Sequence, residues 1–351
     1  MSILRPLLIR ALTMIGVFFV VLLLLVLTLG LTGYSDRILN AVVGEQLRAE
    51  RTALAEKIRD PDQLEKTLTA RRKEMEKFYG LDTPWYFRLP GMVLRVLRLD
   101  LGEARNLRST DGSNRVIDIV LERLPNTMLL LTTSLMLTAV LGLTLGVMMA
   151  TQAGSWVDRA MSVFAAISYA IPTWWIGILL ILILSVRWRV LPSGGMYSTP
   201  PPIESFPRLL DMFKHALLPV LTLVLISVGP YIYSVRTITL NIAQEDHVTL
   251  ARAKGLPESR VRNRHILRVA APPIVTGLIF GLAGSLSGSI LVETVFNWQG
   301  MGRLYYDALA GTPDEGVIVA LTFMFTLMYV AVRLLLEVLY IFLDPRVRYT
   351  D

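Results

Sequence analysis

The chain has 351 residues, of which 53% are hydrophobic and only 18% are charged, and its mean hydropathy is +0.53. Soluble domains usually carry about a quarter charged residues, so this composition indicates a membrane protein. The net charge of +7 reports on orientation in a membrane protein and does not predict nucleic-acid binding. The absence of cysteine excludes disulfides and thiolate sites, and three scattered histidines argue against a zinc site.

Six stretches are long enough to span a bilayer, which takes about 20 mostly apolar residues. Five carry no charge and the last is interrupted only by one Arg and one Glu; they are 11–35, 124–157, 160–186, 215–235, 269–292 and 316–343. We therefore predict an all-α membrane protein with six transmembrane helices. The first stretch is too long for a signal peptide and lacks a small-x-small cleavage site, so 1–35 is predicted to be an anchor helix.

The short loops indicate the orientation. The two N-terminal arginines, the basic stretch 245–268 and the two arginines of the C-terminal tail fall on one side of the membrane. The loop 294–315, on the other side, has one Arg against three acids. Because Lys and Arg accumulate in cytoplasmic loops, both termini are predicted to lie in the cytoplasm, with the chain in the cell (inner or plasma) membrane.

Residues 36–123 are predicted to form a helical extracytoplasmic insertion between the first two spans. The first half is rich in Ala, Glu, Lys, Leu and Arg, which favours helices at about 38–59 and 61–78. Asp60 fits the N-cap of the second helix and Pro61 its first position. A solvated hairpin is preferred over a partner-binding surface, because charged helix faces usually meet water.

The outer loop 187–214 is predicted to be irregular. It contains Gly194, Gly195 and three consecutive prolines at 200–202. Glycine pairs and proline runs interrupt helices. A structural loop is therefore preferred over a proline-rich ligand motif.

Small residues line one face of the fifth span. They allow close approach of helices, either by packing within the subunit or by lining a path or a subunit interface, and the sequence leaves these readings open. Gly277, Gly281, Ser285 and Ser289 share this face at four-residue spacing, and Gly284 and Gly288 repeat the spacing beside it. Gly142 and Gly146 repeat the four-residue spacing in the second span.

Two ionisable residues, Arg333 and Glu337, lie one turn apart in the sixth span. Ionisable groups in a membrane are costly and tend to pair, and this spacing allows an ion pair. A structural intramembrane ion pair is preferred over a proton relay, because no other intramembrane acid is near.

The stretch from Glu245 to Arg268 separates two charge-free spans and holds six Lys and Arg, three acids and two histidines. Residues 245–254 suit a helix with acids in its first turn. Gly255 is placed to end the helix in a left-handed conformation, with Pro257 two positions later. The predicted shape is a short cytoplasmic helix, turned at a glycine and joined to the fifth span. A basic loop held against anionic lipid is the alternative.

Enzyme signatures are missing from the chain. It contains no G-x-x-x-x-G-K-[ST] phosphate loop, no Gly-x-Ser-x-Gly elbow and no His-Glu-x-x-His helix. The chain is therefore expected to bind no ATP and no metal of its own and not to be an enzyme.

Several motifs, in order, resemble those of ABC importer permeases of the dipeptide/oligopeptide branch. They are YGLDTPW (79–85), LDLG (99–102), ERLPNT (122–127), the coupling-helix motif from Glu245 onward, ETVFNWQGMGRL (293–304) and LLLEVLYIFLDPRVRY (334–349). The LDLG and ERLPNT arrangement is similar to the B-type subunit. Three features depart from the family's general pattern: Thr249-Leu250-Ala251 and Arg268 replace its Glu-Ala-Ala and its closing proline, 36–78 is long and charged, and Arg333 is a charged residue in a span.

The resemblance implies a type I permease fold and a set of partners. These are a C-type permease subunit in a heterodimer, two ATPase subunits carrying ATP and Mg²⁺, an extracytoplasmic substrate-binding protein and membrane lipid, and no nucleic acid is implied. The coupling segment, within 240–268, would dock into an ATPase through Glu245, Asp246, Leu250, Ala251, Arg252, Ala253, Lys254, Gly255 and Leu256.

The resemblance also points to the remaining functional residues. The small-residue face of the fifth span is expected to line the path or an interface. Glu293, Phe296, Trp298 and Gly300 are expected to form an outer gate or to contact the binding protein, although aromatic residues at a membrane boundary are also ordinary anchors.

The predicted organisation is an anchor (1–35), an insertion (36–123) and a five-helix permease core (124–351) that transports peptides. Oligosaccharides or nickel chelates are alternative substrates. A stand-alone secondary transporter would require inverted repeats and broken helices, which the sequence does not indicate, and an intramembrane enzyme would require a catalytic constellation.

Overall fold

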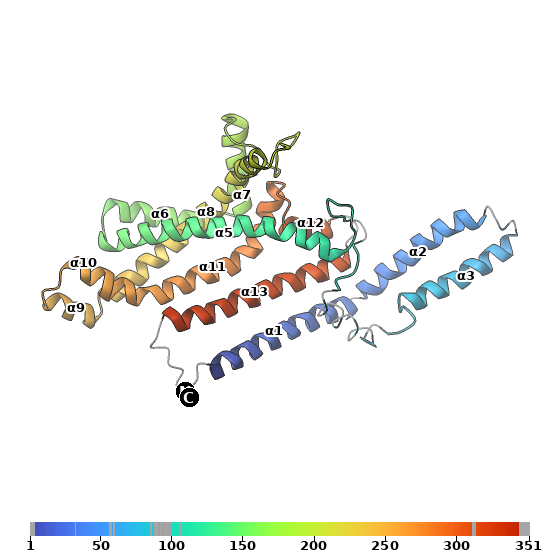
Figure 1. The fold of residues 1–351 in the computed structure, drawn as a ribbon, viewed down its shortest axis with the longest axis horizontal. Helices are drawn as coiled ribbons and strands as arrows, with labels where there is room; N and C mark the ends of the chain where they lie inside the picture. The colour runs from blue at the N-terminus through green and yellow to red at the C-terminus, as the bar shows by residue number, and fades with distance from the viewer. Residues whose placement is uncertain are drawn as a thin grey trace. The chain divides into compact units, whose positions relative to one another are not determined.

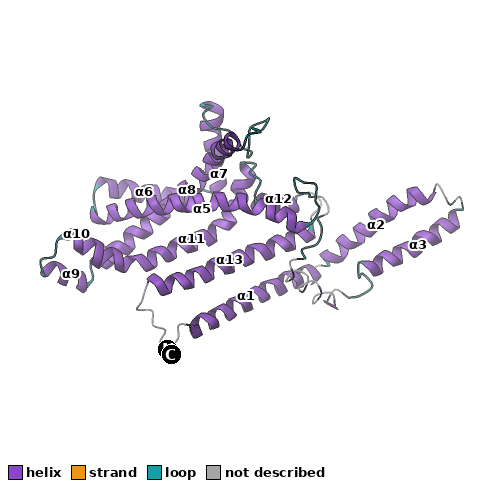
Figure 2. Cartoon of the chain, in the orientation of Figure 1, coloured by secondary structure: helices purple, strands orange, loops and turns teal. Residues whose placement is uncertain are grey.

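A computed structural model describes residues 4–343, apart from Thr32, residues 56–57 and 59, short gaps between 85 and 106, and residues 311–313. Some helical side chains, including those of 282–288 and 335–343, lie outside the described set. The described chain is mostly helical, and no strand is found in it (Figure 2). This confirms the prediction of an all-α protein.

Fourteen helical segments follow one another along the described chain, and Figure 1 labels the α-helices among them. They are α1 (Leu4–Leu31), α2 (Tyr34–Ala55), α3 (Pro61–Phe78), α5 (Val116–Thr151), α6 (Trp156–Ala170), α7 (Thr173–Leu180), the π-helix η1 (Ile181–Arg187), α8 (Ser205–Ala243), α9 (Asp246–Ala253), α10 (Glu258–Arg260), the π-helix η2 (Val261–Leu267), α11 (Arg268–Val295), α12 (Met301–Leu309) and α13 (Glu315–Leu343).

All six predicted apolar stretches lie on these helices. Within the described residues, three segments are long and apolar enough to cross a membrane: Val116–Thr151, Ser205–Ala243 and Val317–Leu334. A fourth crossing results if α6, α7 and η1 make one bent span. The count of six crossings stays a prediction.

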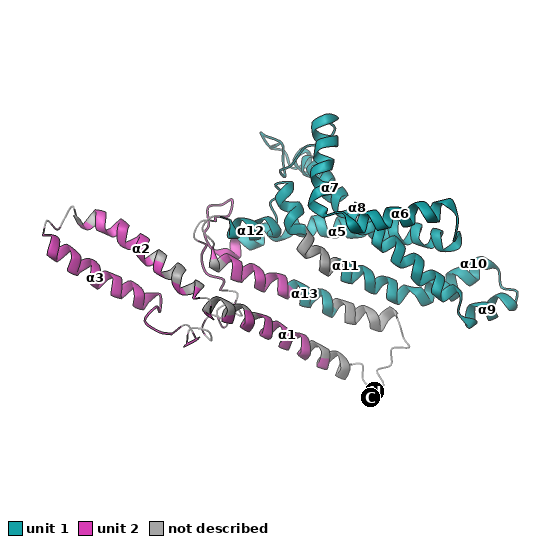
Figure 3. Cartoon of the chain, turned by 180° about the vertical axis from the view of Figure 1, so that it is seen from behind, with its two compact units in different colours: residues 1–7, 119–311, 328–351 teal, residues 8–118, 312–327 magenta. Residues whose placement is uncertain are grey.

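The chain divides into two compact units (Figure 3). Unit 2 comprises 8–118 and 312–327 and contains the hairpin of α2 and α3, which run antiparallel (Figure 1). The Asp60 carboxylate accepts a hydrogen bond from the Asp62 amide at 3.1 Å, which confirms the predicted start of α3. Helix α2 lies about one turn earlier than predicted, because Gly33, with φ +62°, separates it from α1.

Unit 1 comprises 1–7, 119–311 and 328–351, and α8 lies in its core with α6, α7 and α11 packed against it. Leu218, Val224 and Ile232 of α8 are buried in one apolar cluster together with Leu130 of α5. Helix α8 begins at Ser205, ten residues before the charge-free stretch. The irregular loop predicted for 187–214 therefore ends earlier, because the proline run stops at Pro202 and nothing after it prevents a helix.

The predicted third span is not a single helix. Helices α6 and α7 meet at an angle of 104°. The break lies at Ile171, which is extended (φ −88°, ψ 132°), and Pro172, which precedes α7. A residue before proline is pushed out of the helical region, and proline offers no N–H to the preceding turn. The prediction of one helix over 160–186 was wrong for this reason.

Glycines of α5 pack tightly against α8. A Cβ on Gly146 would lie 2.7 Å from the Cβ of Val235 and 2.9 Å from the carbonyl oxygen of Ile232. A Cβ on Gly142 would overlap the ring of Tyr231. The small residues predicted in the second span therefore serve helix packing within the subunit.

Gly146→Ala is expected to destabilise the protein by about 1–3 kcal/mol through overpacking. The matched control is Gly277→Ala in α11, where a Cβ would meet no described atom within 4 Å and alanine is the better helix former by about 1 kcal/mol. The melting temperature of the purified subunit in detergent measures both effects. Equal melting temperatures for the two variants would contradict the packing assignment.

Candidate functional site

Helix α9 is attached to the rest of unit 1 through one apolar face. Val248 and Ala251, one turn apart, are 0% and 3% exposed. They pack in a cluster with Ile242 of α8, Val261 of η2 and Ile274 of α11. The helix has only eight residues, too few to be stable alone, so this burial is what holds it in place.

Helix α9 ends in a Schellman turn at Gly255. The Gly255 amide donates to the Arg252 carbonyl at 2.9 Å, and the Leu256 amide donates to the Ala251 carbonyl at 3.4 Å. Gly255 has φ +72°, the left-handed conformation that this motif requires and that glycine adopts without strain. Leu256 packs in the same apolar cluster as Ala251. The predicted helix, its terminating glycine and the helical continuation through α10 and η2 into α11 are confirmed.

The other face of α9 is exposed. Leu250 is 55% exposed, and Arg252, Ala253, Lys254 and Gly255 are exposed beside it. An exposed leucine on a helix held in place in this way can pack into an apolar pocket of another protein. Of the nine predicted coupling residues, Ala251 faces the chain's own core and Leu256 is half-buried.

Arg252 is already paired within the chain. Its guanidinium donates to the Glu258 carboxylate at 2.8 Å across the Gly255 turn. This hydrogen bond lowers the pKa of Glu258 below its ordinary value, so the carboxylate is ionised at neutral pH. A contact of Arg252 with an acidic group of an ATPase subunit would therefore have to share the guanidinium with Glu258 or replace it.

The two predicted acids at the start of α9 are also exposed. Glu245 is the N-cap residue, and its carbonyl accepts from the Val248 amide at 3.0 Å. Its carboxylate lies 3.1 Å from His247 Nδ1. Asp246 occupies the first turn, where its charge suits the helix dipole.

The predicted small-residue face lines a cavity of about 540 Å³. Gly277 and Gly281 of α11 form one wall, and neither has a described atom within 4 Å of the position of a Cβ. The break between α6 and α7 and the middle of α8 form the other walls. These two glycines therefore border open space, which favours the path or interface alternative. Gly284, Ser285 and Gly288 lie outside the residues whose side chains are described.

Helix α12 lies at the end of α11 remote from α9 (Figure 1). Side chains of α5 and α11 cap its N-terminus. The Met301 amide donates to Thr127 Oγ1 of α5 at 2.8 Å, and the Arg303 amide donates to Glu293 Oε2 of α11 at 3.0 Å. The N-cap residue of α12, Gly300, has no side chain for this purpose. Thr127 Oγ1 in turn donates to Glu293 Oε1 at 2.8 Å. Glu293 is 0% exposed, and its carboxyl group accepts the bonds from the Thr127 hydroxyl and the Arg303 amide at the N-terminus of α12.

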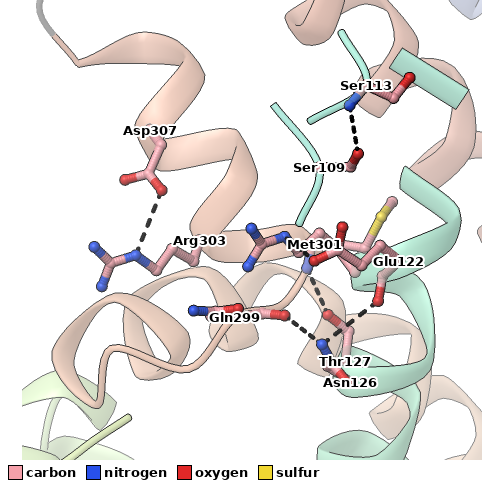
Figure 4. Close-up of polar contacts among 10 residues, drawn as sticks. Ser109, Ser113, Glu122, Asn126, Thr127, Gln299, Met301, Arg303 and Asp307 are labelled. Atoms are coloured by element: carbon pink, nitrogen blue, oxygen red, sulfur yellow. Dashed lines mark hydrogen bonds and ion pairs between the residues drawn. The ribbon is translucent and has the colours of Figure 1, made fainter. Parts of the chain in front are cut away.

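The same junction joins two of the sequence motifs, ERLPNT and ETVFNWQGMGRL. The Asn126 side chain donates to the Gln299 carbonyl at 2.6 Å, and the Trp298 indole donates to the Asn126 carbonyl at 3.1 Å. Figure 4 shows Asn126 and Thr127 turned toward Gln299 and Met301. Phe296 and Trp298 are 1% and 0% exposed. Both rings are core residues, so they are not interfacial anchors.

The junction leaves no surface for a binding protein on the predicted gate residues in this conformation. Glu293, Phe296, Trp298 and Gly300 are all buried. A Cβ on Gly300 would overlap Glu293 Oε2 and lie 2.5 Å from Thr127 Oγ1. These residues hold the end of α11 rigidly, and whether they also gate a path stays a prediction.

The sequence matches the family of binding-protein-dependent transport system inner membrane components over residues 142–349. It is 31% identical over 323 residues to the oligopeptide transport system permease protein AppB of Bacillus subtilis, covering 92% of this chain and 95% of the relative. The chain belongs to this family. It is also 33% identical to a probable peptide ABC transporter permease, y4tP, of Sinorhizobium fredii over 67% of this chain and 72% of the relative. With the glutathione transport system permease GsiC of Escherichia coli K12 it shares 32% identity over 77% and 82% of the two chains.

The family assignment settles the fold and the class of protein. The chain is a multi-pass membrane permease subunit of the type I kind and is not itself catalytic. It also corrects one argument from the sequence. A stand-alone secondary transporter was expected to have broken helices, which the sequence did not indicate, but this permease has one at Ile171 and Pro172. Family membership, and not the absence of a break, is what argues against that alternative.

Arg333 of this permease contacts an aromatic ring. Its guanidinium carbon lies 4.6 Å from the ring centroid of Phe280 in α11, a cation–π contact. The Glu337 side chain lies outside the described residues, so the predicted ion pair stays a prediction. Phe280 lies between Gly277 and Gly281, so Arg333 packs on the helix that lines the cavity.

Sequence reasoning missed several residues of the permease core. Thr127 and Asn126 lie in a motif that was recognised, but their bonds to Glu293 and Gln299 join positions more than 160 residues apart. Asp158 and Arg236 form a charge pair between α6 and α8. Each residue directly follows a charge-free stretch. Two opposite charges at the ends of two predicted spans were the sequence feature that could have predicted this pair.

Proposed function

We propose that this permease subunit forms the translocation path for peptides in an ATP-driven importer, and that separate ATPase subunits drive it by holding α9. One observation carries the proposal. Helix α9 is anchored through Val248 and Ala251 and leaves Leu250 exposed on a rigid, capped turn. A movement imposed on this helix is transmitted to α8 and α11, against which it packs, and α11 lines the cavity.

The other components of the proposed importer are the partners that membership of this family implies. ATP and Mg²⁺ would be bound by two ATPase subunits on the cytoplasmic side, where both termini would lie. A C-type permease subunit would complete the path, and an extracytoplasmic binding protein would deliver the substrate. Membrane lipid would surround the exposed apolar helices, such as α5 with Met136 at 69% exposure.

Peptides are the proposed substrate class because two of the three relatives described above are named as oligopeptide or peptide permeases. Oligosaccharides and nickel chelates remain alternatives for the same architecture. Uptake assays with the assembled importer in proteoliposomes distinguish the three classes directly.

Gly255→Val is expected to reduce ATP-driven uptake of the tripeptide Ala-Ala-Ala at least about tenfold. Valine tolerates a positive φ poorly, so the Schellman turn would rearrange and shift the exposed face of α9. Recovery of ATPase subunits with the tagged permease should fall in parallel. Insertion into the membrane should not change, because Gly255 lies outside the predicted spans.

Gly44→Val is the matched control. Gly44 lies within α2, where its φ is not positive, and a Cβ there would meet no described atom within 4 Å. Uptake by this variant should equal that of the wild type. The Gly255→Val variant could instead take up peptide within twofold of the wild type and still recover ATPase subunits. That result would contradict the proposal that the ATPase subunits hold α9.

A further inference from the structure

The cavity beside α11 is built around interrupted backbone. Residues from Ser168 to Thr173, at the break between α6 and α7, form one side of it. Non-helical backbone inside a membrane protein is tolerated where it is buried in protein or lines a cavity. The Trp175 amide donates to the Pro172 carbonyl at 3.1 Å, so among the first N–H groups of α7 those of Thr173 and Trp174 have no carbonyl in their own helix. On the opposite wall, Pro230 offers no N–H to the carbonyl of Ile226, and both residues line the cavity.

The described lining carries no formal charge. Its side chains are hydroxyl, apolar or absent: Ser168, Tyr169, Ile171, Pro172, Thr173, Leu223, Ile226, Ser227, Pro230, Tyr231, Ser234, Gly277 and Gly281. The volume of about 540 Å³ falls in the range of pockets that hold small ligands. Such a lining can recognise neutral donors and acceptors but offers no counter-ion to a charged side chain.

Two hydroxyls beside the cavity have no hydrogen-bond partner among the described residues: that of Tyr231, which lines the cavity, and that of Thr138, which lines only a smaller pocket next to it. A smaller pocket of about 60 Å³ shares Ser227, Tyr231, Gly277 and Gly281 with the cavity and also includes Thr138. The Tyr231 hydroxyl and Thr138 Oγ1 are buried and make no hydrogen bond to this part of the chain. Thr138 is only 4% exposed. Buried polar groups are normally paired with protein, water or a ligand, so each of these hydroxyls can form a hydrogen bond with a molecule that enters the pocket.

Thr138 differs from three other threonines of α5. Thr132, Thr144 and Thr151 each donate to a carbonyl of the preceding turn, at 2.6, 2.7 and 2.9 Å. A helical threonine can satisfy itself in this manner by choice of rotamer. Thr138 does not, and its hydroxyl stays available to the pocket.

We propose that this cavity binds the backbone of the transported peptide, with Tyr231 and Thr138 supplying hydrogen bonds that do not depend on side-chain charge. The inference rests on the proposed peptide function and assigns substrate-binding residues to this subunit. A peptide backbone carries one donor and one acceptor at nearly every residue. A peptide backbone can therefore form hydrogen bonds both with the hydroxyl groups of the cavity and with the unpaired N–H and C=O groups at its helix breaks, without any charged side chain.

The test uses the assembled importer with its binding protein in proteoliposomes. The double variant Thr138→Val/Tyr231→Phe removes both hydroxyls and nearly keeps the side-chain volumes. We expect kcat/KM for ATP-driven uptake to fall about three- to tenfold, the range for loss of one or two neutral hydrogen bonds. The factor should be the same for Ala-Ala-Ala, Ala-Lys-Ala and Ala-Asp-Ala. Each factor is the kcat/KM of the wild type divided by that of the double variant for the same peptide. The selectivity of the binding protein among peptides therefore cancels.

A structural role predicts a different pattern. Because the two hydroxyls bond nothing in the described chain, their removal should leave the melting temperature unchanged or raise it. Thr132→Val, on the same helix but outside the cavity lining, is the control and should transport like the wild type.

Three results would overturn the inference: unchanged uptake in the double variant, a defect confined to one peptide charge, or a lowered melting temperature with poor recovery of the second permease subunit. Unchanged uptake would mean that water fills the small pocket, whose volume suits about two water molecules. A lowered melting temperature with poor recovery of the second permease subunit would mean that a partner helix fills the cavity. Failure of the wild-type importer to take up any of the three peptides would instead contradict the proposed function itself.

Discussion

Glu293→Ala is expected to cost the subunit about 3 kcal/mol or more of stability. The substitution leaves the Thr127 hydroxyl and the Arg303 amide without their acceptor in a fully buried site. Each buried polar group that loses its partner costs about 1–3 kcal/mol, and a cavity remains where the side chain was. The N-terminus of α12 also loses its cap. Thermal unfolding of the purified subunit in detergent, followed by fluorescence-detected size exclusion, measures the loss.

Glu293→Gln separates hydrogen bonding from packing. Its carbonyl oxygen can still accept from the Arg303 amide, while its NH₂ group faces the Thr127 hydroxyl, which can reorient and accept. This variant should therefore be less destabilised than Glu293→Ala. The exposed Glu204, at the start of α8 and without a capping bond, provides the control Glu204→Ala. If Glu293→Ala melted at the same temperature as Glu204→Ala, the capping role would be wrong.

The parts of the structure that the sequence predicted well depend on local chemistry. Gly255 ends α9 and Asp60 begins α3 because turn and cap geometry involve residues at most a few positions apart. The apolar stretches predicted helices because a bilayer requires them. The break at Pro172 was also local, but hydropathy does not register it, since both sides of the break are apolar.

The site itself depends on contacts that no local pattern encodes. The sequence predicted Glu293 to belong to an outer gate or a binding-protein contact. Its position as a cap of α12 depends on tertiary packing, which places Thr127, 166 residues earlier, beside it. Likewise, glycines with the same spacing have opposite roles. Gly146 is pressed against α8, whereas Gly277 borders a cavity. Spacing predicts which residues share a face, but the neighbour of that face is decided by tertiary packing.

Asp158→Ala is expected to destabilise the subunit by about 3–5 kcal/mol, because it leaves the largely buried charge of Arg236 without its partner. Arg236, whose side chain is 20% exposed, holds the 5% exposed Asp158 with two nitrogens, one of them at 2.8 Å. Asp158 also accepts from the Gly154 amide at 2.8 Å, so the pair ties the start of α6 to α8.

A double-mutant cycle with Arg236→Ala isolates the pair. The double variant should lose less stability than the sum of the single variants, because neither charge is then left alone. Glu65→Ala is the control, since Glu65 and Arg51 form a pair that is 66% and 63% exposed and worth at most about 1 kcal/mol. Additive losses in the cycle would show that the two charges act separately. A strong coupling would show that the two charges act as one pair that holds the start of α6 to α8.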